Sequence, residues 1–170
     1  MSKSLGNGID LRRFDRARVR HRARAEHRAA LGIGDDEVLV GLVGRLVREK
    51  GYGDVVAAAA RLAEREGPVR FMVIGPDAPD KPDALRADDR AAAEALGVPF
   101  LGRRDDVEEL YAAMDLYALA SWREGYPRSA MEAAAMGLPI VATDVRGCRQ
   151  VVVDGATGLL VAPHRPKALA

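Results

Sequence analysis

Short apolar runs that alternate with helix-forming stretches constrain the fold of this chain most strongly. The runs cover residues 38–44, 69–74, 98–102, 116–120, 139–143 and 158–161. Helical patterns are expected at 11–30, 52–66, 83–96, 107–114, 130–136 and 147–152. The first run is apolar throughout, as strands buried on both faces of a parallel sheet are. The alternation therefore predicts an α/β fold with a doubly wound, Rossmann-like parallel sheet.

Composition excludes several classes of protein. The 170 residues correspond to one domain with room for a core, and a net charge of +1 favours no particular class of partner. A single cysteine, Cys148, excludes an internal disulfide and is typical of a reducing compartment, so we expect a cytoplasmic protein. We interpret Cys148 as a small packed residue rather than a reactive thiol. No apolar run approaches the roughly 20 residues of a membrane span.

The most informative polar residues lie in Glu124–Glu132, between the predicted strand 116–120 and the helix after it. Ligands of open α/β sheets bind beyond the carboxyl ends of the strands. A helix N-terminus at that place favours an anion. Two carboxylates, Glu124 and Glu132, suit hydroxyl groups instead, because they only accept hydrogen bonds when ionised. The segment predicts a ligand that carries both phosphates and hydroxyls, such as a nucleotide-sugar.

A second group of polar residues follows the first predicted strand. Gly44 allows the backbone to approach a ligand closely. Arg45 offers a planar fork for a phosphate, and Lys50 offers a mobile point charge. The alternative is that both side chains are solvated loop cations.

Together these segments resemble the donor-binding motif of the family 4 glycosyltransferases, which have the GT-B fold and retain anomeric configuration. The resemblance extends from about Asn7 to the end of the chain and covers only the second of the two domains of such enzymes. It implies that residues 1–10 are a linker or an added start, and that residues 11–170 are a nucleotide-sugar donor-binding domain truncated at its C-terminal end. The N-terminal acceptor domain would be missing, so we expect donor binding by this chain without turnover.

The resemblance also implies roles for individual residues. Arg45 and Lys50 would hold the donor diphosphate and stabilise it as it leaves, and Glu124 would face the hexose. Glu132 would accept hydrogen bonds from the ribose hydroxyls. These catalytic assignments to Arg45, Lys50 and Glu124 mean stabilisation of the leaving group and sugar, since no nucleophile is evident. The full set of expected donor-binding residues is Gly44, Arg45, Lys50, Arg103, Glu124, Gly125, Tyr126, Pro127, Arg128 and Glu132.

We expect no metal and no cofactor. The sequence has no Asp-x-Asp, and its three histidines and one cysteine form no cluster at ligand spacing. His27 in particular is interpreted as a surface residue. The expected donor is a UDP-sugar, with a GDP-sugar second. The segment Ala142–Arg149 resembles a subgroup of bacterial enzymes that add sugars to lipid-linked or polysaccharide precursors.

Two other functions are weighed against this one. An NAD-type oxidoreductase domain fits the sheet pattern, but no Gly-x-Gly-x-x-Gly follows the first strand, and the second ends at Gly75 rather than at an acidic residue. A non-catalytic nucleotide-binding module stays open.

The predicted helix 11–30 is strongly basic. We interpret it either as a solvated face or as a surface attracted to a phosphorylated acceptor or to an anionic membrane, at the inner face of the cell membrane. Nucleic acid is disfavoured as a partner, because Phe14 is the only aromatic residue there.

Overall fold

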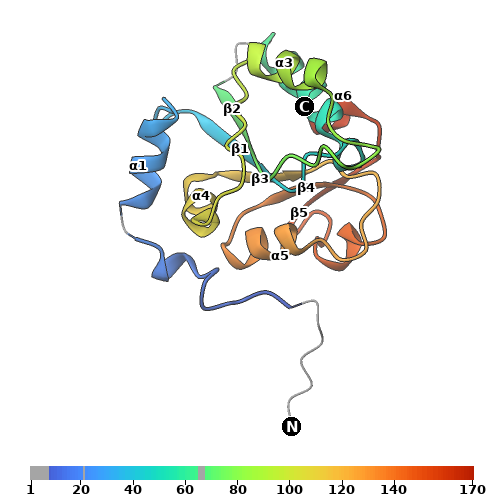
Figure 1. The fold of residues 1–170 in the computed structure, drawn as a ribbon. Coiled ribbons are helices and arrows are strands. Elements are labelled where there is room, and N and C mark those ends of the chain that lie inside the picture. Colours follow the sequence, from blue (N-terminus) through green and yellow to red (C-terminus); the bar gives the residue numbers. More distant parts are fainter. Residues whose placement is uncertain (1–7, 21, 65–67) are drawn as a thin grey trace.

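A parallel sheet forms the centre of the molecule (Figure 1). The structure is a computed structural model that describes residues 8–20, 22–64 and 68–170. Across the sheet the strands lie in the order β2 (Val69–Ile74), β1 (Val38–Val43), β3 (Leu116–Leu119), β4 (Ile140–Thr143) and β5 (Gly158–Val161). All neighbouring pairs are parallel. The predicted α/β class and parallel sheet are confirmed.

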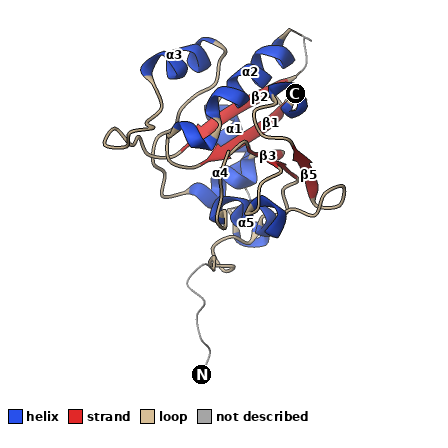
Figure 2. Ribbon diagram, turned by 90° about the vertical axis from the view of Figure 1, so that its right-hand side faces the viewer, coloured by secondary structure: helices blue, strands red, loops and turns tan. Residues whose placement is uncertain are grey.

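Helices cover both faces of this sheet, as Figure 2 shows. One face carries α2 (Tyr52–Ala63), α3 (Ala87–Ala95) and α6 (Pro166–Leu169). The other carries α4 (Val107–Ala113) and α5 (Arg128–Ala135), with α1 (Ala23–Ala30) packed on α4. The described residues also form short 3₁₀ helices, η1 (Arg16–Arg18), η2 (Arg48–Lys50) and η3 (Cys148–Gln150). Among the described residues, no helix is both long enough and apolar enough to cross a membrane.

Successive side chains of each strand point to opposite faces and build two separate cores. Leu39 and Tyr117 lie in the core beneath α4 and α5, whereas Val40 and Ala118 lie in the core beneath α2. Because a strand alternates its side chains between the two faces of a sheet, an apolar residue is needed at every position. This explains the continuous apolar runs of the sequence.

The order of the strands reverses between β1 and β3. The chain leaves β1 for β2 on one side and then returns to place β3 on the other side. The loops that follow β1 and β3 therefore lead to opposite sides of the sheet. The place where they leave the carboxyl ends of these strands, called the crevice below, is where open α/β sheets bind ligands. The two polar segments singled out in the sequence lie in these two loops.

Two glycines allow the backbones around this crevice to approach closely. Gly51 has φ +72°, and a Cβ atom there would overlap the carbonyl group of Ala120. Gly75 has φ +150°, and a Cβ atom there would overlap the carbonyl group of Gly44. Both conformations also strain residues with side chains. The loops after β1, β2 and β3 are thus fixed against one another by contacts between main chains.

The prediction of one helix over residues 11–30 is wrong for the first half of this segment. The chain turns at Asp10, continues through η1, and becomes α-helical only in α1. The Asp15 carboxylate accepts a hydrogen bond from the Ala17 amide, which favours a short capped turn over a continuous helix. The arginines of this segment are also not all solvated. Arg28 is buried and donates to the Asp115 carboxylate at 2.8 Å, and Arg24 donates to the same carboxylate at 2.6 Å.

Two other sequence-based expectations need correction. Helix α3 begins only at Ala87, because residues 83–85 instead hydrogen-bond to residues 46–48. The expected strand 98–102 forms one bridge, Val73–Phe100, beside β2. Residues 1–7 of the expected linker, residue 21 and the end of the expected helix 52–66 lie outside the described residues.

The close approach of Gly51 can be tested against a nearby glycine. We expect Gly51→Ala to lower the free energy of unfolding by about 1–3 kcal/mol, because φ is positive and the new Cβ atom meets the Ala120 carbonyl group. Gly53→Ala, two residues further on in α2 with open space around its Cα, is expected to raise it by about 0.4–1 kcal/mol. Urea unfolding followed by circular dichroism measures both. Equal effects of the two substitutions would contradict the account of the crevice.

Candidate functional site

An ion pair joins the two loops at the reversal of strand order. The Nζ atom of Lys50, in η2 after β1, lies 2.6 Å from Oε1 of Glu124, in the loop after β3. Both side chains are largely buried, with 19% and 9% of their surface exposed. The structure thus brings together a cation and a carboxylate that are 74 residues apart in the sequence.

The Glu124 carboxylate is held in place from behind. The Ser121 hydroxyl, which is fully buried, donates to the same Oε1 atom at 2.7 Å. The Thr143 hydroxyl donates to the Ser121 carbonyl oxygen, so β4 supports the loop after β3. The backbone of Glu124 lies so close to Gly147 that no Cβ atom fits there. Because both hydrogen bonds end on Oε1, the Oε2 atom is left to accept a hydrogen bond from a ligand.

Glu132 is the fifth of the eight residues of α5, on the side that faces α4. The Tyr111 hydroxyl, from α4, donates to Glu132 Oε2 at 3.2 Å and contacts the Ser129 carbonyl oxygen at 3.0 Å. Burial raises the pKa of the Glu132 carboxyl above its ordinary value of 4.5, although Tyr111 and the nearby Arg128 and Arg13 oppose the shift. Glu132 is therefore a partly desolvated acceptor whose orientation is fixed by a buried tyrosine.

The cations expected to bind phosphate lie on either side of the crevice. Arg45 and Arg128 are both exposed, in the loop after β1 and at the first residue of α5. The carbonyl groups of Gly44 and Arg45 accept hydrogen bonds from the buried Tyr52 hydroxyl at 2.9 and 3.2 Å, which fixes this loop. In the part of the chain that the structure describes, no side chain caps the N-terminus of α5, so its first N–H groups are available to an anion.

The remaining residues of the predicted site are placed less tightly. Gly125 and Tyr126 are exposed in the loop before α5, and Pro127 is the buried residue from which the helix starts. Arg103 lies on the loop that follows the bridge at Phe100, and its only ion-pair partner in the described part of the chain is Asp105, at 3.9 Å. Both side chains of that pair are more than 80% exposed, so Arg103 is not in contact with Lys50, Glu124 or Glu132.

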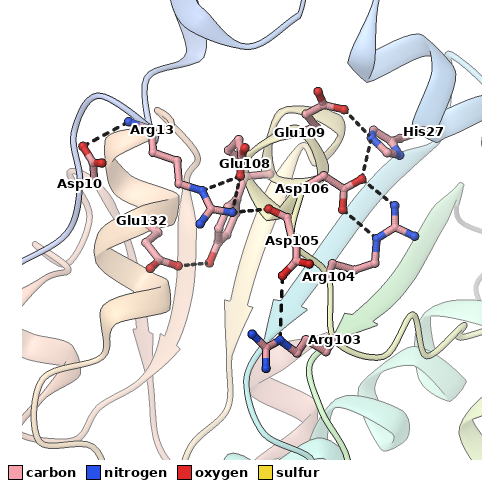
Figure 3. Close-up of polar contacts among 11 residues, drawn as sticks. Asp10, Arg13, His27, Arg103, Arg104, Asp105, Asp106, Glu108, Glu109 and Glu132 are labelled. Atoms are coloured by element: carbon pink, nitrogen blue, oxygen red, sulfur yellow. Dashed lines mark hydrogen bonds and ion pairs between the residues drawn. The ribbon is translucent and has the colours of Figure 1, made fainter.

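The interpretation of His27 as an unpartnered surface residue is wrong. His27 lies 3.1 Å from Glu109 and 3.8 Å from Asp106, and ligand atoms of the three residues lie within 4.8 Å of one another (Figure 3). Such a group is capable of holding a metal ion. Each carboxylate also forms two hydrogen bonds to an arginine, Glu109 with Arg20 and Asp106 with Arg104. Arginines and His27 hold the pKa of both carboxyl groups down, at about 2.

Four residues that support the site were not singled out from the sequence: Tyr52, Tyr111, Ser121 and Thr143. Only Ser121 carried a local signal, since it directly follows the apolar run of β3. The others contact the site from elements distant in sequence. Cys148 is buried, as predicted, and burial raises the pKa of its thiol to about 11, so the thiolate is disfavoured.

An apolar cavity of about 390 Å³ lies away from these residues, between the sheet, α2 and α6. It is lined by aliphatic and aromatic side chains, including Val40, Leu62 and Leu169. This cavity lacks the polar groups that would orient a nucleotide. The crevice between the loops after β1 and β3 is therefore the better candidate.

Comparison with known proteins places the chain. The sequence model of the family described as Glycosyl transferases group 1 matches residues 37–170. The D-inositol 3-phosphate glycosyltransferase of Corynebacterium urealyticum is 35% identical over 174 residues, which cover 96% of this chain and 40% of that protein. The chain thus spans about 40% of the length of this curated relative.

Solved structures agree with the sequence matches. The Anabaena protein Alr3699/HepE, in complex with UDP and glucose, superposes with a TM-score of 0.79 and 28% identity, over 96% of this chain and 44% of that one. The C-terminal domain of the Francisella tularensis group 1 glycosyltransferase LpcC superposes with a TM-score of 0.77 and 25% identity, over 96% of this chain and 84% of that one. This chain therefore belongs to the group 1 glycosyltransferases, the family 4 enzymes of the GT-B fold that its sequence motifs indicate.

Proposed function

We propose that this chain binds the nucleoside diphosphate-sugar donor of a hexosyltransferase that works with retention of configuration and without a metal ion. The acceptor in the whole protein would be a glycan or a lipid-linked precursor. The Lys50–Glu124 ion pair is the observation that carries the proposal. It supports the proposal because a cation suited to a diphosphate and a carboxylate suited to sugar hydroxyls, from the loops after β1 and β3, lie 2.6 Å apart.

The pair has a chemical use at the leaving group. A bound diphosphate would compete with Glu124 for the Lys50 ammonium, because charge-assisted hydrogen bonds to phosphate are strong. Arg45 and the open N-terminus of α5 add positive potential at the same place. Negative charge that develops on the diphosphate as the glycosidic bond breaks would be stabilised by groups already in position. Glu124, relieved of Lys50, would bind a hydroxyl of the hexose.

The second carboxylate fits the nucleoside. Glu132 lies further along α5, away from the phosphate end, where its carboxylate could accept two hydroxyl hydrogen bonds from a ribose. Arg103 would lie near the base. UDP is the first choice of nucleotide and GDP the second. The structures of HepE with UDP and with UDP-glucose support the first choice.

The comparisons do not favour the oxidoreductase alternative, since every relative that they describe here is a glycosyltransferase. A module that binds a nucleotide without turnover is the second candidate. The chain spans 40% of the D-inositol 3-phosphate glycosyltransferase of Corynebacterium urealyticum. In that relative, as in other two-domain enzymes of the GT-B fold, we expect the acceptor to bind to an N-terminal domain. Mixing the chain with donor and acceptor distinguishes the two candidates by the presence or absence of transfer.

We propose contact with an anionic membrane only through those arginines of the basic segment that are exposed and not paired with an acid. Arg13, Arg20 and Arg28 each pair with an acid from α4 or the residue that precedes β3. Arg12 and Arg16 are exposed. Attraction to an anionic surface would therefore depend on fewer charges than the sequence alone indicates.

Calorimetric titration with UDP tests the proposed function. We expect binding by the wild-type chain, and a loss of about ten- to a hundredfold in affinity for Arg45→Ala and for Glu132→Ala, as removal of a hydrogen bond to a charged group costs about 1.5–3 kcal/mol. Glu94→Ala, on the exposed side of α3, is the matched control and should bind as the wild type does. A chelator should leave the affinity unchanged. Wild-type affinity in both site variants would exclude this crevice.

The raised pKa of Glu132 predicts the pH dependence of binding. A carboxylate accepts hydroxyl hydrogen bonds better than a protonated carboxyl group. Because its pKa is above 4.5, protonation and loss of affinity should begin at a higher pH than for an exposed glutamate. Affinity should be full above this pKa and fall as the pH decreases through it.

UDP-glucose is the ligand of choice for this measurement, since its diphosphate diester does not titrate in the range concerned. Glu132→Gln should bind more weakly and show a flatter profile between pH 7.5 and pH 5. Parallel profiles for the two proteins would show that another group controls the binding.

A further inference from the structure

We propose that the segment Asp10–Phe14 belongs to the nucleoside end of the donor site, with Arg13 as a positioning residue that holds the loop 102–106 opposite Glu132. The inference rests on the proposed function and extends it to a segment for which the sequence assigned no role at the site. It predicts that residues before α1 contribute to nucleotide affinity although none of them lies in the sheet or in its crossover helices.

Arg13 connects this segment to the loop that carries Arg103. Its Nη2 atom donates to the Asp105 carbonyl oxygen at 2.5 Å, and its Nε atom donates to Glu108 Oε2 at 2.8 Å. Figure 3 shows the Arg13 side chain reaching toward Asp105 and Glu108, beside Glu132. One guanidinium group therefore fixes both the end of the loop and the first turn of α4. These contacts join residues more than 90 positions apart.

The same segment also supports the acceptor for the ribose. Phe14 is buried and packs edge-on against Tyr111, with ring centroids 5.9 Å apart and an interplanar angle of 78°. The Tyr111 hydroxyl donates to Glu132. The turn at Asp10 sets the direction of both side chains, because its carboxylate accepts from the Arg12 amide at 2.8 Å and its carbonyl oxygen accepts from the Phe14 amide at 2.9 Å.

The positive charge of Arg13 also supports Glu132 as a hydrogen-bond acceptor. Its positive charge lowers the pKa of Glu132 and so opposes the larger effect of burial. Arg13 thereby favours the ionised carboxylate, which is the form that accepts hydrogen bonds from two ribose hydroxyls. The segment thus contacts a support of each place where a nucleoside would be recognised: Asp105, at the end of the loop expected near the base, and Tyr111, which donates to Glu132. Among the described residues, the polar partners of the Lys50 and Glu124 side chains are each other and Ser121, so the segment forms no hydrogen bond or ion pair with either of them.

Arg20 offers a matched control. It also crosses from the segment before α1 to a glutamate of α4, with two hydrogen bonds to Glu109 at 2.6 and 2.7 Å. Its partner lies on the side of α4 that faces His27, away from Glu132. Loss of Arg20 removes a similar ion pair without touching the loop 102–106.

The test compares Arg13→Ala, Arg13→Lys and Arg20→Ala for binding of UDP and of inorganic pyrophosphate. We expect Arg13→Ala to weaken UDP by about tenfold, as for a lost hydrogen bond to a charged group, and to leave pyrophosphate within about twofold. Arg13→Lys should recover part of the UDP affinity, and Arg20→Ala should bind UDP as the wild type does. Hydrogen exchange at residues 102–106, in the absence of ligand, should become faster in Arg13→Ala only.

Several results would overturn the inference. Equal losses for UDP and pyrophosphate in Arg13→Ala would indicate general damage to the site. Equal behaviour of Arg13→Ala and Arg20→Ala, in binding or in hydrogen exchange, would show that Arg13 is an ordinary surface ion pair. If the wild type binds UDP and Arg13→Ala does so equally well, only this inference fails. If the wild type binds neither UDP nor GDP, the proposed function fails with it.

Discussion

The site depends on the close contact between the loops that follow β1 and β3. These two strands are neighbours at the point where the order of the sheet reverses, so their loops would otherwise diverge. The main chain closes the distance: Gly51 lies against the Ala120 carbonyl group, and the Trp122 amide donates to the Glu49 carbonyl oxygen at 2.8 Å. Lys50 is carried on one side of this contact and Glu124 is held close on the other. The ion pair is thus a consequence of how two backbones fit together.

The chemistry of the crevice follows from the way in which its charges are held. Lys50 and Glu124 are mostly buried but compensate each other, which avoids the cost of an isolated buried charge. Ser121 and Thr143 fix the carboxylate from the side of the sheet, so it need not reorganise when a ligand arrives. In a polyanionic ligand rich in hydroxyl groups, an anionic group can take the place of Glu124 beside Lys50, and a hydroxyl group can take the place of Lys50 beside Glu124. A neutral or purely apolar ligand cannot do so, which limits the class of donor that this crevice would accept.

Much of the fold could be predicted from the sequence because it depends on local patterns. The apolar runs of β1 and β3 and the Gly-Tyr-Pro loop before α5 carry their own signals. The failures have a common physical cause. Residues 11–20 look helical by composition, but Arg13 and Arg20 pair with α4, and those partners lie about 90 residues away. His27 was misinterpreted for the same reason, since Glu109 and Asp106 are remote in sequence.

The site could be predicted only in part, for a related reason. Motif spacing identified Lys50, Glu124 and Glu132 as polar residues near strand ends. It could not show that Lys50 contacts Glu124, or that Tyr111 orients Glu132 from another helix. Tyr111 and Tyr52 look like core aromatics in the sequence, and their rings are indeed buried. Their hydroxyl groups act at the site, and a hydrophobic pattern does not reveal where a hydroxyl points.

The most direct test of the central claim is to map UDP onto the isotopically labelled chain by nuclear magnetic resonance. The account predicts that backbone amide signals shift on titration at residues 44–50, 102–104 and 124–132, on the two sides of the crevice. Signals around the apolar cavity between α2 and α6, such as those of Leu62 and Leu169, should stay in place. Shifts confined to that cavity, with none at Lys50, Glu124 or Glu132, would contradict the claim that the reversal of strand order between β1 and β3 creates the donor site.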